Sequence, residues 1–259
     1  MELIEEIKRY LNQKKEVVQD SNNNSIEVID GPHEKVMKFN SIVYSRIRND
    51  SIYTHQYWDF FLPLAHMYKN PNILMIGLGG GTIPFQLEKM LKDKVSIDVI
   101  EINKKIAELS REFIPENTRT NIIIGDGADY VHNNAGTYDL VILDAFINAS
   151  VPNQFFTDDF IEGAYYCLKE NGMLAINYLN PPNKEIIMED FVVKLRRRFN
   201  VYRINISLMA LNTIIICPKT YDKETVLDKV KSGFPFSRES EFMLKEYNAI
   251  SEPVSGSFF

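Results

Sequence analysis

The sequence predicts an α/β fold, doubly wound, with a mainly parallel sheet of seven strands and a small N-terminal β region. Beyond residue 71, short apolar runs alternate with longer segments of helical periodicity. Several of the apolar runs contain almost no polar residue, which is typical of strands covered by helices on both faces. Alternation of this kind indicates one sheet with helices on either side.

The elements follow one another in a regular order. The expected strands of the large sheet cover 72–77, 95–101, 120–125, 138–144, 172–179, 201–206 and 212–217. Helical periodicity is found over 82–92, 103–114, 157–170 and 184–199. Only a short connection joins the last two strands, so we expect them to pair antiparallel rather than through a crossover.

The pattern differs before residue 71. Short alternating runs between residues 16 and 49, separated by turn residues, predict a small β-meander, and residues 53–68 predict a linking helix. A charged amphipathic segment, expected to be helical, precedes the meander. The predicted division of the chain is therefore 1–70 for this N-terminal part, 71–220 for the α/β domain and 221–259 for a helical tail.

Composition limits the classes of function. A chain of 259 residues with 45% hydrophobic and 25% charged residues is ordinary for a globular protein with a buried core. The net charge of -6 argues against a nucleic-acid surface, which needs a basic field. No apolar run approaches the roughly twenty residues of a membrane span, and the N-terminal segment lacks the apolar centre of a signal peptide. We therefore expect a cytoplasmic protein without nucleic-acid or membrane partners.

Neither a metal site nor a disulfide is expected. The two cysteines, Cys167 and Cys217, lie in apolar stretches and are expected to be small buried hydrophobic residues. The four histidines show no metal-ligand spacing.

A glycine-rich turn follows the first strand of the large sheet. Gly77, Gly79 and Gly81 lie between this strand and the next helix, where an open α/β sheet binds its ligand. Glycine lets the backbone turn tightly and lets a ligand approach where a Cβ would collide. No Gly-Lys-Ser/Thr sequence follows, so the turn is not a nucleoside triphosphate loop. It indicates a dinucleotide or another adenosine-bearing ligand, the alternative being a purely structural turn.

Acidic residues follow the next strands in order. Glu101 ends the second strand, where a carboxylate accepts hydrogen bonds from ribose hydroxyls. Asp126, followed by Gly127, comes after the third strand, where an acceptor meets the adenine amine, and Asp144 closes the fourth. The alternatives are a solvated residue for Glu101 and a loop cap for Asp144. Together with the glycine turn, the series favours a ligand of the S-adenosylmethionine type over NAD, because NAD gives no particular reason for Gly-Asp-Gly after the third strand.

These motifs, in this order and spacing, resemble the spermidine synthase family, a branch of the class I methyltransferase-like (Rossmann-like) fold. The segments that carry the resemblance are 62–81 (LPLAHMYKNPNILMIGLGGG), 99–103 (VIEIN), 124–131 (IGDGADYV) and 138–176, which begins YDLVILDAF. The resemblance implies a transferase that uses S-adenosylmethionine or its decarboxylated form. It also implies Asp144 as the residue that orients or deprotonates the acceptor, and a homodimer formed through the N-terminal region.

The sequence departs from the family where the family holds amines. The family's aspartate in the glycine turn, which contacts the amine of decarboxylated S-adenosylmethionine, is replaced by Gly80. A second aspartate, in the catalytic loop, falls on Ile147, and a glutamate before the first strand falls on Tyr57. A diamine needs carboxylates at both ends, and a missing carboxylate removes a repulsion against intact S-adenosylmethionine. We therefore expect intact S-adenosylmethionine as the donor, with Gln56 and Tyr57 covering the acceptor pocket.

Three functions stay open at this point. The first is methyl transfer to a small acceptor, with Asp144 positioning or deprotonating an amine or a hydroxyl. The second is aminopropyl transfer from decarboxylated S-adenosylmethionine, as in spermidine synthase. The third is a binding module without turnover. For Tyr57 and Trp58, the alternative to a place in the pocket is a core position in the linking helix.

Overall fold

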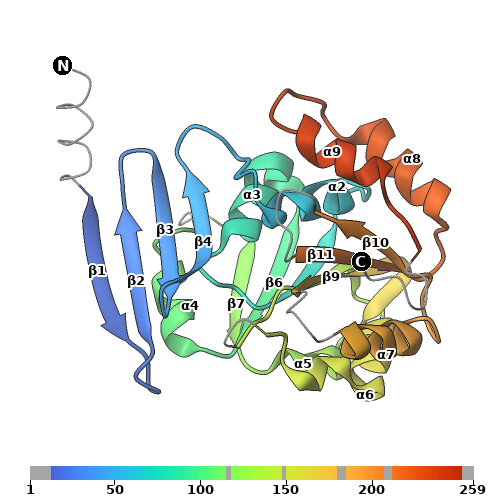
Figure 1. Cartoon of the computed structure of the whole chain (residues 1–259), viewed down its shortest axis with the longest axis horizontal. Coiled ribbons are helices and arrows are strands. Elements are labelled where there is room, and N and C mark those ends of the chain that lie inside the picture. Colours follow the sequence, from blue (N-terminus) through green and yellow to red (C-terminus); the bar gives the residue numbers. More distant parts are fainter. Residues whose placement is uncertain (1–12, 115–117, 148–149, 180–184, 207–211, 253–259) are drawn as a thin grey trace.

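The computed structural model describes residues 13–114, 118–147, 150–179, 185–206 and 212–252. They form a four-stranded sheet and a seven-stranded sheet, which stand side by side in Figure 1. The helix expected at the N-terminus falls largely on residues 1–12 and so lies outside the described residues.

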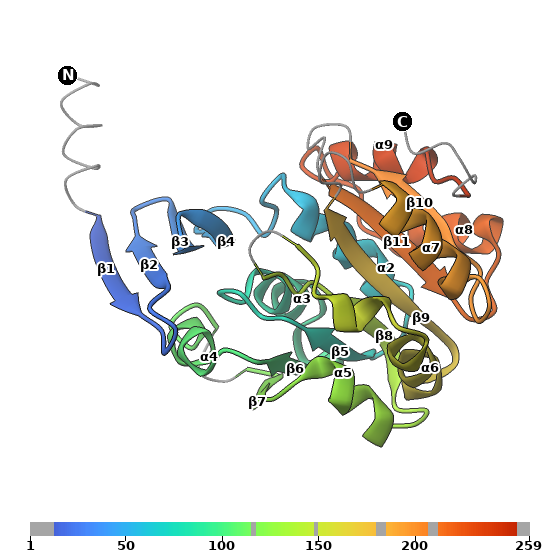
Figure 2. The same ribbon diagram turned by 60° about the horizontal axis from the view of Figure 1, so that its bottom comes forward.

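The N-terminal part is an antiparallel meander, as predicted. Its strands, which pair in sequence order, are β1 (Lys14–Gln19), β2 (Ser25–Asp30), β3 (Glu34–Phe39) and β4 (Ile42–Arg48). Ile26 and Met37 of this sheet are fully buried and pack with Ile106, Leu109 and Phe113. Figure 2 shows the meander beside α4 (Lys104–Ser110), at one side of the large sheet.

The large sheet has the strand order β10-β11-β9-β8-β5-β6-β7. Its strands are β5 (Asn72–Ile76), β6 (Ser96–Glu101), β7 (Thr120–Ile124), β8 (Tyr138–Leu143), β9 (Leu168–Leu179), β10 (Tyr202–Asn205) and β11 (Asn212–Pro218). The strands from β9 to β7 in this order are parallel, whereas β11 runs antiparallel to both of its neighbours. The doubly wound sheet and its antiparallel last pair are therefore confirmed.

Helices cover both faces of the large sheet. Along β5, Ile73 and Met75 belong to one core, and Leu74 and Ile76 to the other, which explains why the strand has no polar face. The first core includes residues of α2 (Phe61–His66), α3 (Thr82–Leu91), α8 (Lys223–Gly233) and α9 (Glu241–Asn248). The second includes residues of α6 (Asp158–Cys167) and α7 (Glu185–Leu195), beside the short α5 (Gly127–Tyr130). Figure 1 shows the two groups on opposite sides of the strands.

Two helical segments differ from the sequence expectation. The helix expected over 53–68 is reduced to a 3₁₀ turn, η1 (Tyr57–Phe60), followed by α2. The preceding residues turn around the buried carboxylate of Asp59, which accepts hydrogen bonds from the backbone N–H groups of Thr54 and His55. The tail contains α8, which the sequence indicates, and also α9, which it does not.

Candidate functional site

A cavity of about 1030 Å³ lies where β4 and the β1–β2 turn face the carboxyl ends of the parallel strands. Its wall brings together most of the residues that the sequence analysis singles out. They are Gln56, Tyr57, Gly77, Gly79, Glu101, Asp126, Gly127 and Asp144. Gly81 and Gly80 are not among the residues that line it. The cavity is large enough for an adenosyl ligand and a second small molecule.

The glycine turn needs glycine for reasons of backbone geometry and of space. Gly77, Gly79 and Gly81 have φ angles of 90°, 54° and 89°, in the left-handed region that side chains disfavour. A Cβ on Gly77 would lie 2.4 Å from the carbonyl oxygen of Asp144, and one on Gly79 would lie 2.6 Å from that of Tyr44. The turn is therefore packed closely between β4 and the end of β8. Gly81, in contrast, makes room for Ile114 rather than for the cavity.

Position 80 faces the meander. A Cβ on Gly80 would lie 2.7 Å from the Cβ of Ser45 and 3.2 Å from that of Met37. Ser45 is held there because its hydroxyl hydrogen-bonds the hydroxyl of Thr82 and accepts from the Thr82 N–H at 3.1 Å. An aspartate at position 80 would have to displace Ser45. The missing carboxylate is thus linked to the tight packing of β4 on the turn.

Glu101 ends β6 with only 6% of its surface exposed. Its carboxylate accepts hydrogen bonds from the backbone N–H of Leu78 at 2.9 Å and of Asn103 at 2.8 Å. Burial raises the pKa of Glu101, and these backbone donors oppose the shift by stabilising the charged form. The side-chain amide of Asn103 in turn donates to Asp20 of the β1–β2 turn at 2.8 Å. The meander is therefore hydrogen-bonded to the segment that orients Glu101.

Asp126 caps the N-terminus of α5 and also accepts hydrogen bonds from the side-chain amide of Gln154, a residue outside this helix. It accepts a hydrogen bond from the N–H of Ala128 at 2.8 Å. The side-chain nitrogen of Gln154 donates to both of its carboxylate oxygens, each at 2.9 Å. An amide NH₂ resembles the exocyclic amine of adenine as a donor. Gly127, the next residue, allows the first turn of α5 to pack closely on β5, because a Cβ there would lie 2.2 Å from the side chain of Ile76 in β5.

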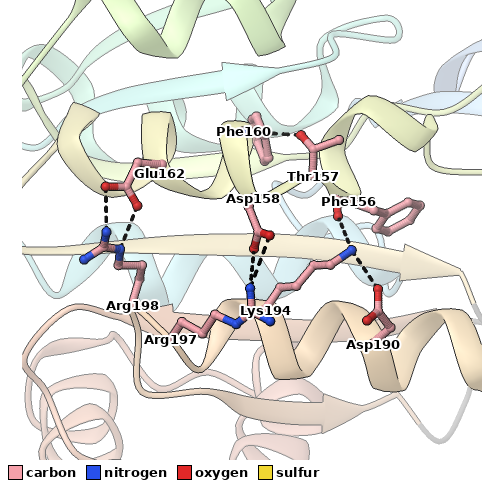
Figure 3. Close-up of polar contacts among 9 residues, drawn as sticks. All are labelled: Phe156, Thr157, Asp158, Phe160, Glu162, Asp190, Lys194, Arg197 and Arg198. Atoms are coloured by element: carbon pink, nitrogen blue, oxygen red, sulfur yellow. Dashed lines mark hydrogen bonds and ion pairs between the residues drawn. The ribbon is translucent and has the colours of Figure 1, made fainter.

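The segment that carries Gln154 is anchored by α7. Gln154 belongs to the 3₁₀ turn η4 (Asn153–Phe156), and Lys194 of α7 donates to the carbonyl of Phe156 at 3.2 Å. Figure 3 shows this contact together with ion pairs from Arg197 and Arg198, which follow α7, to residues of α6. Lys194 therefore holds the segment that carries Gln154, and the two arginines join the end of α7 to α6.

Asp144 directly follows β8 and is held by side chains from distant parts of the chain. One carboxylate oxygen accepts from the side-chain amide of Asn177 at 2.8 Å, the other from the hydroxyl of Tyr57 at 3.3 Å. The carbonyl of Asn177 accepts from the amide of Asn212 at 2.8 Å, which turns the NH₂ group of Asn177 toward Asp144. Burial raises the pKa of Asp144 to about 6, while the contacts from Asn177 and Tyr57 lower it.

Two tyrosines stand beside this carboxylate. Burial raises the pKa of Tyr57 well above its usual value, and the charge of Asp144 adds to the shift. Burial also raises the pKa of Tyr44, on β4, to about 12, with contributions from Glu101 and Asp144. Tyr57 lies on the cavity wall and also packs against the first core, and Tyr44 lies within the field of both carboxylates.

Sequence reasoning overlooks Asp20, Tyr44, Gln154, Asn177 and Asn212. Each is a single polar residue in a strand or a turn, with no motif around it. A weak signal exists for Asn177, because an amide in an otherwise apolar strand interior needs a hydrogen-bond partner. Among the described residues, no group of three or more histidine, cysteine or acidic side chains could hold a metal ion. Within that same part of the chain, we find no helix with the length and apolar character of a membrane span.

Comparisons with known proteins agree with the geometry. The family model described as the spermine/spermidine synthase domain matches residues 60–224, more than half of the chain. The chain is 28% identical over 152 residues to a polyamine aminopropyltransferase of Clostridium beijerinckii, covering 55% of this chain and 53% of that one. It is 29% identical over 176 residues to a polyamine aminopropyltransferase of Thermoanaerobacter sp., covering 61% of each. The alignments thus span less than two thirds of these relatives.

The fold is shared over a longer stretch than the alignments. The crystal structure of a probable spermidine synthase from Corynebacterium glutamicum superposes with a TM-score of 0.71 at 18% identity, covering 89% of this chain and 86% of that chain. On the match to the family model and the order of the site residues, the chain belongs to the spermine/spermidine synthase family.

Proposed function

We propose that the protein transfers an aminopropyl group from decarboxylated S-adenosylmethionine to an amine. The observation that carries the proposal is that one cavity brings together Glu101, Asp126 and Asp144, in the order in which a nucleoside and then a transferred group would meet them. The names of the curated relatives, polyamine aminopropyltransferases, support the same reaction.

The nucleoside of the donor fits the residues that the glycine turn and the strand ends present. Glu101 would accept hydrogen bonds from the ribose hydroxyls, with its carboxylate oriented by the backbone N–H groups of Leu78 and Asn103. Asp126 would accept from the adenine amine in place of the Gln154 amide. The bare backbone at Gly77 and Gly79 would face the sulfonium, and Gly127 would shape the wall beside the base.

Asp144 would act on the acceptor. With a pKa of about 6 it is mostly ionised at neutral pH, so it can hold an ammonium group and then take a proton from it. The lone pair of the freed amine attacks the propyl carbon next to sulfur and forms the N–C bond. The C–S bond breaks with its electron pair going to sulfur, which leaves as the neutral thioether methylthioadenosine. The contacts from Asn177 and Tyr57 keep the carboxylate facing the cavity.

Aminopropyl transfer replaces methyl transfer, which the sequence alone favours. That preference depends on Gly80, read as a carboxylate lost from the donor site. Position 80 does not line the cavity, and the direction of its Cβ is filled by Ser45 and Met37. Gly80 is therefore accounted for by the packing of β4, and it gives no reason to prefer the intact methyl donor. The relatives, in turn, favour the aminopropyl reaction.

The test combines binding with product analysis. Calorimetry of the full chain should give at least tenfold tighter binding for decarboxylated than for intact S-adenosylmethionine, about 1.4 kcal/mol. Incubation with an amine panel should release methylthioadenosine, measured by mass spectrometry. Release of S-adenosylhomocysteine from the intact donor would instead establish methyl transfer. Tight binding of a donor without release of either product would indicate a binding module without turnover. Asp144→Asn is the control, expected to bind the donor and release little product.

Two further predictions of the sequence join this proposal. We infer a homodimer formed through the meander, supported by Val17 on the edge strand β1, an apolar side chain that is 54% exposed. Sedimentation analysis would test the dimer, and the variant Val17→Lys should weaken it. The cytoplasmic location remains a prediction, which cell fractionation would test.

A further inference from the structure

We propose that the preferred acceptor is an amine with one amino group on an apolar chain, not a diamine. This inference rests on the proposed aminopropyl transfer and names its acceptor. It follows from the side chains that surround Asp144 within the cavity.

The acceptor end of the cavity can be traced outward from Asp144. Tyr57 and Asn177 contact its carboxylate, and Asn212 contacts Asn177. The ring of Trp58 lies tilted beside that of Tyr57, with ring centroids 4.8 Å apart, and Leu179 pairs with Asn212 across β9 and β11. Ile147 follows Asp144 in the same loop. We call these residues the acceptor end: Tyr57, Trp58, Asp144, Ile147, Asn177, Leu179 and Asn212.

Asp144 is the one carboxylate in this set of described residues. The other acidic residues in the cavity wall are Asp20, Glu101, Glu108 and Asp126. They lie at what we call the nucleoside end, the part of the cavity proposed to hold the adenosyl group. Glu101 and Asp20 are joined through Asn103, and Asp126 is bonded to Gln154. Glu108, on α4, faces Lys105 at 3.4 Å.

The count of charges during transfer decides between the two kinds of acceptor. The donor already brings a sulfonium and an ammonium group. A monoamine that has given its proton to Asp144 is neutral when it attacks. A diamine at the same step still carries its second ammonium group, because amines of this type are protonated at neutral pH. Asp144 has by then accepted a proton, so it no longer offers a full negative charge to that group.

The rest of the acceptor end suits methylene groups better than a second charge. Trp58 is 4% exposed, and Ile147 and Leu179 add apolar surface. The side-chain carbonyl of Asn177 is already bonded to the amide of Asn212. An ammonium group buried here would lack a charged partner, which is costly, whereas an alkyl chain gains from the same contacts.

Trp58 provides a direct readout, because it is the single tryptophan of the chain. Its fluorescence should be titrated with pentylamine and with 1,4-diaminobutane, which have equal length, in the presence of methylthioadenosine. Pentylamine should bind at least tenfold more tightly, and its kcat/KM with decarboxylated S-adenosylmethionine should be higher by a similar factor. Equal or tighter binding of the diamine would overturn the inference. It would also be overturned if neither amine bound.

A matched pair of variants tests the cause. Ile147 is 57% exposed, so a polar residue is tolerated there. Ile147→Asp should shift the ratio of the two dissociation constants toward the diamine by at least tenfold, while the uncharged Ile147→Asn should keep the wild-type order. An unchanged ratio in Ile147→Asp would show that the number of carboxylates does not set the preference.

The two proposals fail in different ways. Absence of methylthioadenosine release with every amine would end the proposed reaction. The ratio of the binding constants, which needs no turnover, decides the acceptor class.

Discussion

The nucleoside end and the acceptor end of the cavity are built in different ways. At the nucleoside end, Glu101 and Asp126 each accept from the backbone N–H two residues further along the chain. Glu101 also accepts from the N–H of Leu78, and Asp126 from the side chain of Gln154. At the acceptor end, Asp144 is held by the side chains of Asn177 and Tyr57, 33 and 87 residues away. In the proposed nucleoside end, main-chain donors therefore contribute at both carboxylates, whereas in the proposed acceptor end the donors to Asp144 are side chains.

The difference has an electrostatic consequence. Burial raises the pKa of both carboxyl groups; at Glu101 the backbone donors of the strand end oppose this shift and orient the carboxylate as a hydrogen-bond acceptor. Asp144 has a pKa of about 6, close to neutral pH, which suits a group that takes and releases a proton. We expect changes at the nucleoside end to alter affinity and changes at the acceptor end to alter rate.

The largest effect is expected for Asp144→Asn. Asparagine keeps the shape but cannot take a proton, so kcat should fall by roughly 10³-fold, within the range for a general base. The dissociation constant of the donor should change by less than about twofold. Product release and calorimetry measure the two quantities. A parallel loss of donor affinity would contradict the separation of the two ends.

Glu101→Gln should weaken donor binding and leave kcat nearly unchanged. Removing the charge that faces the ribose should weaken donor binding by about 10- to 100-fold, the equivalent of losing a charged hydrogen bond. At saturating donor, kcat should stay within about threefold of wild type. Glu108→Gln is the matched control, because Glu108 also lines the cavity but is half exposed beside Lys105. Calorimetry should show little change for Glu108→Gln, and an equal loss in both variants would mean that general cavity charge sets the affinity.

Asn177→Leu should move the acid limb of the pH–rate profile. The Asn177 amide stabilises ionised Asp144, so its loss raises the pKa of Asp144 above about 6. Since the ionised form is the active one, activity should be lost at higher pH than in wild type, with the limb shifted upward by about one unit. Tyr57 and Tyr44 stay neutral in this range because their pKa values are raised.

Asn212→Leu should shift the same limb in the same direction by less, because Asn212 only orients Asn177. Rates at saturating substrates between pH 5 and 9 measure both shifts. A limb that stays in place in Asn177→Leu would show that Asn177 has no part in the protonation of Asp144.

The smallest effect is expected for Gln154→Ala. Its amide must leave Asp126 before an adenine amine can bind, so its removal should tighten donor binding by about threefold, the size of one exposed hydrogen bond. Calorimetry against wild type measures this change. Weaker binding would indicate that Gln154 contacts the donor itself.

Much of the nucleoside end could be predicted because it follows from local sequence. Glycines at positive φ and acidic residues at strand ends can be recognised in the sequence, since few other residues satisfy those positions. Gln154 and Asn212 could not be found in this way, because one amide in a turn or strand has no period and its partner is far along the chain. The helix α9 was also missed, although its residues Met243 and Tyr247 are fully buried in the core.

The sequence by itself determined the doubly wound sheet, the glycine turn and the order of Glu101, Asp126 and Asp144, since all three follow from periodicity and from the ends of strands. Only the tertiary structure decided which distant side chains pack against these residues or form hydrogen bonds with them. It placed Ser45 against Gly80, so the packing of β4 accounts for that glycine without a change of donor, and it brought Asn177 and Asn212 to Asp144. The physical reason is that backbone conformation is set by neighbours in the chain, whereas the charge and solvation of a carboxylate are set by whatever packs against it.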